Sequence, residues 1–170
     1  MTAENPHDHD DWQYWVDFVA YPVVFAITAW ASWSGLAWIA WAALGAVSWT
    51  LAEYWVHRSV LHTFFWHGTH ERHHLHPREH VAFPLWFTPL SFSGIFVVSY
   101  ACGLPVAWWS GFVLGYVWFL TVHHLLHHVD LTEGTWLERY ARWHDKHHQG
   151  RPCNYGITTN VWDKLFKTSE

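Results

Sequence analysis

Two long stretches of the chain carry no charged side chain. Residues 18–52 and 81–129 contain no Asp, Glu, Lys or Arg, and one membrane-spanning helix needs only about 20 apolar residues. Each stretch is therefore long enough for a hairpin of two helices. The alternative is two helical hairpins buried in a soluble core, which we disfavour because a soluble helix normally has a polar face.

Turn signals divide both stretches into two helical arms. The first hairpin is expected over residues 18–62, with its turn near residues 32–35. The second is expected over residues 88–129, with its turn at residues 102–105, where Gly and Pro break a helix. The pattern predicts an all-α integral membrane protein with four transmembrane helices in two hairpins, plus a helical cap that carries histidine motifs.

The polar C-terminal region follows a different pattern. Residues 130–134 are typical of a loop, and residues 135–148 of a helix, because aromatic residues and a histidine recur there every three or four positions. Such a helix suits either the membrane surface or the face of its own domain.

Composition and charge favour a membrane setting and give it an orientation. Aromatic residues make up 20% of the chain, with 16 Trp, and charged residues only 14%, whereas a soluble domain usually carries about 25% charged residues. Every Lys and Arg lies outside the two uncharged stretches. Since hairpins return the chain to one side, the positive-inside rule predicts that both termini and the histidine motifs are cytoplasmic.

The first seventeen residues hold five acids and no Lys or Arg, and the formal net charge of the chain is −5. Residues 1–17 are therefore predicted to form an acidic, solvated N-terminal leader rather than a secretory signal, which would begin with basic residues. Residues 18–170 are predicted to form one membrane-bound domain. No nucleic-acid partner is expected.

Candidate chemistry lies in the histidines. The chain has 17 of them, and most fall in four spaced groups: His57 and His62; His70, His73 and His74; His123, His124, His127 and His128; His144, His147 and His148. Neutral imidazole is a good ligand for first-row metals, and residues three or four apart are neighbours on a helix. The second and fourth groups both have the spacing H-x-x-H-H, although chance would produce it at roughly one position in a thousand.

Spacing alone leaves three points open. His57 and His62 are five apart, which turns about 140° on an ideal helix, so they need not serve one metal unless the helix frays near His62. In the third group, His123 with His127 and His124 with His128 are equally spaced on different faces. Glu53, four residues before His57, either orients that histidine or solvates the helix end.

Together these motifs resemble the fatty acid hydroxylase/sterol desaturase superfamily. The resemblance covers roughly residues 51–168 and rests on the four histidine groups and on the tail at residues 154–168. It implies two Fe ions held by histidines alone, with O₂ as co-substrate, although imidazole sites also accept Zn. Within the third group, the resemblance selects His123 and His127, and it implies no catalytic residue besides the metal ligands. The ten implied ligands are His57, His62, His70, His73, His74, His123, His127, His144, His147 and His148.

The resemblance also implies a function for the domain at residues 18–170. It would be a di-metal monooxygenase that hydroxylates a C–H bond of a fatty acyl, sterol-like or isoprenoid lipid in the membrane. Lipid desaturation and carotenoid ring hydroxylation by the same chemistry stay open. A separate ferredoxin- or cytochrome b5-like electron donor is expected, because the leader is too short for a fused haem domain.

Two alternative functions do not involve lipid oxidation. One is a histidine-rich metal-binding or transport protein of the membrane, although a transporter should place polar ligands near the bilayer midplane. The other is a protein that binds haem between paired histidines.

Overall fold

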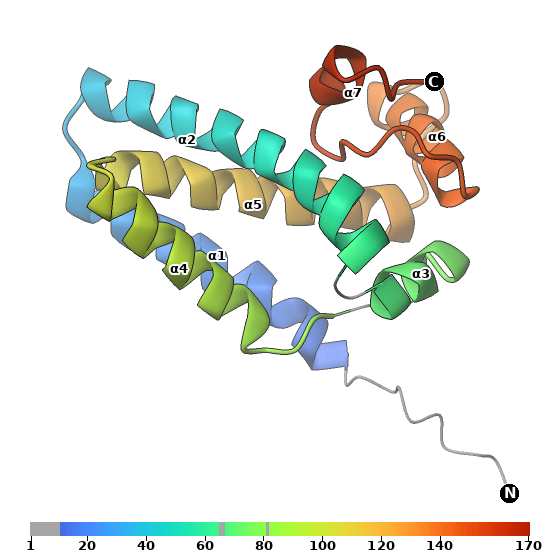
Figure 1. Ribbon diagram of the computed structural model, residues 1–170, viewed down its shortest axis with the longest axis horizontal. Coiled ribbons are helices and arrows are strands. Elements are labelled where there is room, and N and C mark those ends of the chain that lie inside the picture. The colour runs from blue at the N-terminus through green and yellow to red at the C-terminus, as the bar shows by residue number, and fades with distance from the viewer. Residues whose placement is uncertain (1–10, 65–66, 81) are drawn as a thin grey trace, which may run out of the picture.

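The computed structural model describes residues 11–64, 67–80 and 82–170, and these residues form helices and loops without any strand (Figure 1). This confirms the predicted all-α class. In chain order the helices are α1 (Asp11–Ser32), α2 (Leu36–Trp55), the π-helix η1 (Val56–Phe64), α3 (His67–Leu75), α4 (Phe87–Ala101), α5 (Val106–His128), α6 (Trp136–His148) and α7 (Val161–Leu165).

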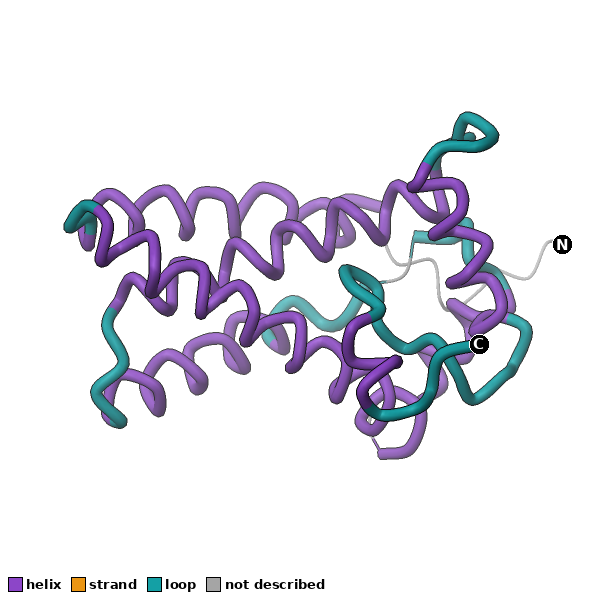
Figure 2. The backbone as a smooth tube through the Cα atoms, turned by 90° about the horizontal axis from the view of Figure 1, so that it is seen from above, coloured by secondary structure: helices purple, strands orange, loops and turns teal. Residues whose placement is uncertain are grey.

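The long helices form an elongated bundle, and the short ones gather at one of its ends. Figures 1 and 2 show α1, α2, α4 and α5 running along the long axis, with α3, α6 and α7 at the end where α5 finishes. The turns between α1 and α2 and between α4 and α5 lie at the opposite end. Gly35 and Gly103 occupy these turns with φ of 74° and 84°, values that favour glycine. Both predicted hairpins are therefore present.

Within the described part of the chain, three helices are long and apolar enough to cross a membrane: Trp12–Ser32, Leu36–Thr63 and Val106–His128. Their outer faces are apolar too, since Trp30 and Leu36 are each 85% exposed. Helix α4 has 15 residues, about 22 Å of helix, which is shorter than a hydrocarbon core of about 30 Å. Length therefore supports three of the four predicted transmembrane helices, and α4 is shorter than a full span.

Helix α1 begins earlier than the hairpin pattern predicts. Residues 11–17, predicted as part of the leader, are helical, and the remainder of the leader, residues 1–10, lies outside the described part of the chain. Asp17 explains the extension, because its Oδ2 accepts a hydrogen bond of 2.5 Å from the Tyr116 hydroxyl on α5. A carboxylate that signals solvent in the sequence is thus paired inside the bundle.

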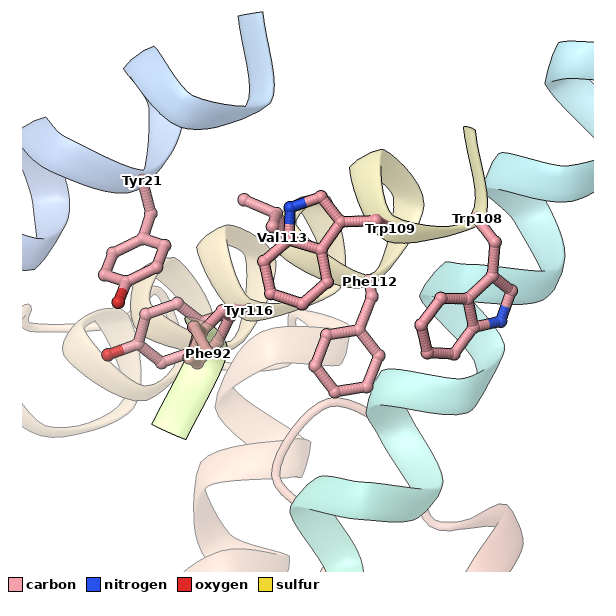
Figure 3. Close-up of a cluster of buried hydrophobic side chains, with 7 residues drawn as sticks. All are labelled: Tyr21, Phe92, Trp108, Trp109, Phe112, Val113 and Tyr116. Carbon is pink, nitrogen blue, oxygen red and sulfur yellow. The ribbon is translucent and has the colours of Figure 1, made fainter. Parts of the chain in front are cut away.

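Helix α5 forms the centre of the bundle. Its buried side chains Trp109, Phe112, Val113 and Tyr116 pack with residues of α1 and α4 in one cluster (Figure 3). Buried glycines allow the helices to approach each other closely, as small residues commonly do between membrane helices. A Cβ at Gly45 of α2 would overlap the Trp108 carbonyl oxygen, and one at Gly111 of α5 would overlap that of Ala42.

This close approach gives a prediction for stability. Gly45→Ala and Gly111→Ala are each expected to lower the free energy of unfolding by about 1–3 kcal/mol, because backbone must move to accept the methyl group. Gly94→Ala in α4 is the matched control, since nothing lies within 4 Å of the added Cβ. It should be neutral or stabilise by up to about 1 kcal/mol through helix propensity. Thermal unfolding in detergent measures all three, and equal melting temperatures would contradict this packing.

Candidate metal centre

The π-helix η1 brings together two histidines that an α-helix would separate. Its hydrogen bonds join residues five apart, so His57 and His62 project from one side, with ring centroids 5.3 Å apart. The prediction that these two need not share a site assumed ideal α-helical rotation. A wider helical turn, rather than fraying, aligns them.

Nine of the ten candidate ligands fall into two groups of ring nitrogens. One nitrogen from each member lies within 4.8 Å of those of all other members of its group. The first group draws on η1, α3 and α6, and the second on α3, α5 and α6. The first group is His57, His62, His70, His74 and His147; the second is His73, His123, His127 and His148.

His144, the tenth candidate, lies beside the second group. Its side chain is 1% exposed, its Nε2 lies 3.1 Å from Nε2 of His148, and its ring centroid lies 5.2 Å from that of His127. The two groups adjoin each other, since the rings of His74 and His148 stack at 4.4 Å.

Backbone carbonyls determine which nitrogen of two histidines carries the proton. Nδ1 of His57 donates to the Tyr155 carbonyl at 2.6 Å, and Nδ1 of His147 donates to the Cys153 carbonyl at 2.9 Å. In a neutral ring the other nitrogen, Nε2, then bears a lone pair. These two Nε2 atoms lie 2.9 Å apart. Two facing lone pairs repel each other unless a cation lies between or beside them, so the first group fits a metal ion.

The second group also presents an unused nitrogen. Nε2 of His127 is buried and lacks a hydrogen-bond partner among the described residues. A buried polar atom without a partner is costly, and coordination of a first-row metal would remove that cost. The donor set therefore suits two ions held by imidazole.

The remaining pair of the third motif faces elsewhere. His124 Nδ1 lies 3.0 Å from the Tyr14 hydroxyl, and the His124 ring stacks on His128 at 4.8 Å. His128 in turn contacts His80 at 4.7 Å. The structure thus separates the two pairs that spacing could not distinguish.

The sequence motifs did not indicate the role of the loop at residues 153–158, which carries the Cys153 and Tyr155 carbonyls. Buried Glu53 binds it from α2: Oε1 accepts from the backbone N–H groups of Ile157 at 2.6 Å and Thr158 at 2.9 Å, and Oε2 from the Thr158 hydroxyl at 2.7 Å. Glu53 therefore neither contacts His57 nor solvates the helix end. It acts on His57 through the loop, whose Tyr155 carbonyl is the acceptor.

Asp163, fully buried at the start of α7, binds the same loop. Its carboxylate accepts hydrogen bonds from the backbone N–H groups of Tyr155 at 2.8 Å and Gly156 at 2.9 Å, and from the Thr168 hydroxyl at 2.8 Å. No spacing rule pointed to Asp163. The available signal was that Asp163 is the one acid in residues 154–168.

An apolar cavity of about 320 Å³ leads to the histidines from inside the bundle. Its wall includes Phe92 and Ile95 of α4 and Phe112 of α5, and at the other end His57 and His123. Such a volume is at the small end of ligand pockets, which are usually about 300–1,000 Å³. The cavity can hold a narrow apolar chain with one end against the histidines.

Burial makes the cap histidines poor bases. Desolvation, followed by the charge of neighbouring histidines, lowers the pKa of His74 to about 4 and the pKa of His147 to about 3. The same causes lower the pKa values of His70, His73 and His148. At neutral pH these imidazoles are uncharged, which is the form that binds metal.

These shifts predict acid sensitivity of the metal-free protein. An unfolded histidine takes up its proton near pH 6.5, whereas folded His74 and His147 remain neutral until about pH 4 and pH 3. The unfolded state therefore binds more protons between these limits, and stability falls as the pH drops below 6.5. Unfolding temperatures of chelator-treated protein should decrease from pH 7 to pH 5. A flat profile would contradict burial of neutral imidazoles.

Comparison with known proteins gives matches in sequence and in fold. Residues 42–168 match the fatty acid hydroxylase family. Dihydroceramide fatty acyl 2-hydroxylase FAH2 of Arabidopsis thaliana is 31% identical over 138 residues, and fatty acid 2-hydroxylase of Homo sapiens is 32% identical over 145 residues. Each match covers 73% of this chain, but 58% of the plant protein and 38% of the human one.

The fold resembles a solved structure of full-length Scs7p in which only the hydroxylase domain is visible. The TM-score is 0.73 at 24% sequence identity, and the match covers 92% of this chain and 66% of that chain. The helical arrangement is therefore shared beyond the residues that the sequence match covers.

Proposed function

Because the chain belongs to the fatty acid hydroxylase family, we propose that it is a membrane-bound di-iron monooxygenase that hydroxylates a C–H bond of a fatty acyl lipid. One observation carries this proposal: an apolar cavity inside the bundle ends on two groups of inward-facing imidazole nitrogens. An oxygenase that acts on an unactivated carbon needs this combination of an apolar cavity and a metal centre.

The proposed ligands divide by group. His57, His62, His70, His74 and His147 would hold one ion. His73, His123, His127 and His148, with His144 beside them, would hold the other. When bound, two iron ions supply the activation of O₂ and the oxidation of the C–H bond. Zinc would suit the same imidazoles in a purified sample.

The chain itself positions the substrate and the ligands. Phe92, Phe112 and Ile95 exclude water from the acyl chain, and the Tyr155 and Cys153 carbonyls keep His57 and His147 in the ligating tautomer. A cavity of only about 320 Å³ favours an acyl chain over the bulkier ring of a carotenoid. The position of the histidines at one end of the bundle does not favour metal transport through its middle.

We propose a cytoplasmic orientation for the histidine end, with α4 and α5 as a hairpin that enters from that side and returns to it. Cys102 tests the orientation, because it is exposed in the turn at the opposite end of the bundle, whereas Cys153 is buried. A membrane-impermeant thiol reagent should label Cys102 from outside intact cells or spheroplasts. Labelling only in inside-out vesicles would indicate the opposite orientation, with Cys102 on the cytoplasmic side.

The electrons are proposed to come from a separate ferredoxin- or cytochrome b5-like donor. Arg139 and Arg142 are exposed on α6 next to the histidine groups, and a basic surface suits an acidic redox protein. Arg142 is paired with Glu138, so Arg139 is the better residue for a charge-reversal test of donor affinity.

Product analysis tests the function. Iron-loaded protein, a chemical or protein reductant, O₂ and a membrane lipid extract should yield a fatty acyl product about 16 Da heavier than its precursor. A product 2 Da lighter would instead indicate desaturation, and an oxidised carotenoid would indicate the ring hydroxylase. Metal binding without any oxidised lipid over broad extracts would contradict an oxygenase and favour a metal-binding protein.

A further inference from the structure

One wall of the apolar cavity is polar. Asp17 of α1, Thr88 and Ser91 of α4 and Tyr116 of α5 all line the cavity. Tyr116 donates to Asp17 at 2.5 Å, and Thr88 lies close enough to interact with both. Three helices thus bring polar side chains to one place in a cavity whose lining is otherwise largely Phe, Ile, Leu and Val together with the histidines and a few further polar residues, among them Gln13, Glu53 and Glu79.

A saturated acyl chain gives no reason for this wall. Asp17 lies inside the candidate span Trp12–Ser32, where a carboxylate is costly and usually functional. A ligand cavity that is mostly apolar fixes the orientation of its ligand through a few placed polar groups. The carboxylate has about four lone-pair sites, of which the Tyr116 hydroxyl occupies one.

The distance from the histidines suggests what the wall binds. Tyr116 precedes His123 by seven residues on α5, about 10 Å along the helix axis. A polar group of the lipid bound there would hold the carbon that faces the histidines at a fixed separation. Asp17 lies outside residues 42–168, which carry the family match, whereas Thr88 and Tyr116 lie within them.

We propose that Asp17, Thr88 and Tyr116 form a subsite that binds a hydroxyl group of the lipid substrate. The ligand hydroxyl donates to the Asp17 carboxylate and accepts from the Thr88 hydroxyl. The inference rests on the proposed lipid oxidation, because it assigns the cavity to the substrate of that reaction. The hydroxyl can come from the head of the lipid or from the far end of its chain, and two pairs of probes distinguish these sources.

The test measures lipid binding to the purified full chain in detergent by quenching of its tryptophan fluorescence. N-palmitoyl-sphinganine is compared with N-palmitoyl-octadecylamine, which lacks the head-group hydroxyls, and 16-hydroxyhexadecanoic acid with hexadecanoic acid. In one of these two pairs, whichever carries the hydroxyl at the right position, the wild-type chain should bind the hydroxylated member about tenfold more tightly. This is the effect expected for one charge-assisted hydrogen bond. Asp17→Leu and Tyr116→Phe should each remove that preference.

Tyr21→Phe is the matched control. Its ring lies 4.8 Å from that of Tyr116, with both hydroxyls visible in Figure 3, but Tyr21 does not line the cavity, so this variant should keep the preference. Equal binding within both pairs by the wild-type chain would overturn the subsite without any variant. Equal weakening of all four probes by Asp17→Leu and Tyr116→Phe would also overturn it, because a purely structural role predicts that result. An oxidised product without a preference would refute the subsite alone, and a preference without any product would refute the oxidation alone.

Discussion

Replacing His147 with alanine is expected to empty the first group of its metal and to lower hydroxylation at least about 100-fold. Removing a residue that only hydrogen-bonds to a metal ligand typically lowers metal affinity or activity about 10–100-fold. His147 is proposed as a ligand itself, so its loss should have a larger effect. Its Nε2 lies 2.9 Å from that of His57 and 3.0 Å from that of His62. The substitution therefore removes one donor and leaves two others facing a space that water can enter.

Metal content per chain and the rate of product formation measure this prediction. His76→Ala is the control, because His76 is exposed and lies outside both groups. His148→Ala should lower the metal content as well, through the second group. A His147→Ala protein with two metals and wild-type turnover would contradict the assignment of the first group.

Glu53→Ala is expected to reduce both stability and metal affinity although Glu53 touches no histidine nitrogen in the structure. It leaves the N–H groups of Ile157 and Thr158 without their acceptor, and each unsatisfied buried group costs about 1–3 kcal/mol. The free energy of unfolding should fall by about 2–5 kcal/mol. Metal affinity should fall about 10–100-fold, because the Tyr155 carbonyl that orients His57 moves with the loop.

Glu53→Gln separates charge from hydrogen bonding. Its amide oxygen can still accept from both N–H groups, so its effects on melting temperature and chelator competition should be much smaller than those of Glu53→Ala. Glu133→Ala, in an exposed loop, should match the wild type. Equal behaviour of Glu53→Ala and wild type would show that the loop holds its position without this carboxylate.

The four helices of the bundle were predictable from sequence because each depends on local chemistry. Uncharged runs and Gly or Pro in the turns suffice to place α1, α2, α4 and α5, and regular spacing suffices for α6. The start of α1 was not predictable from local pattern, because the partner of the acidic Asp17 is Tyr116, 99 residues away in the chain.

The histidine site also has a part that was predictable from sequence and a part that was not. Spacings of three and four indicated the motifs on α3, α5 and α6, since those helices are regular. The shared location of His57 and His62 depends on a π-helix, which the hydrophobic pattern does not predict. The acceptors of Nδ1 are backbone carbonyls, which every residue carries, so no side-chain motif marks Tyr155 or Cys153.

The position of those carbonyls imposes an order on the biogenesis of the protein. Residues 153–158 emerge from the ribosome after every histidine of the two groups, and Asp163, which binds that loop, emerges later still. Until these residues are translated, the Nδ1 atoms of His57 and His147 lack their acceptors, and either ring nitrogen could coordinate a metal. We therefore expect metal loading through the correct nitrogens to follow closure of the loop, after translation of the domain.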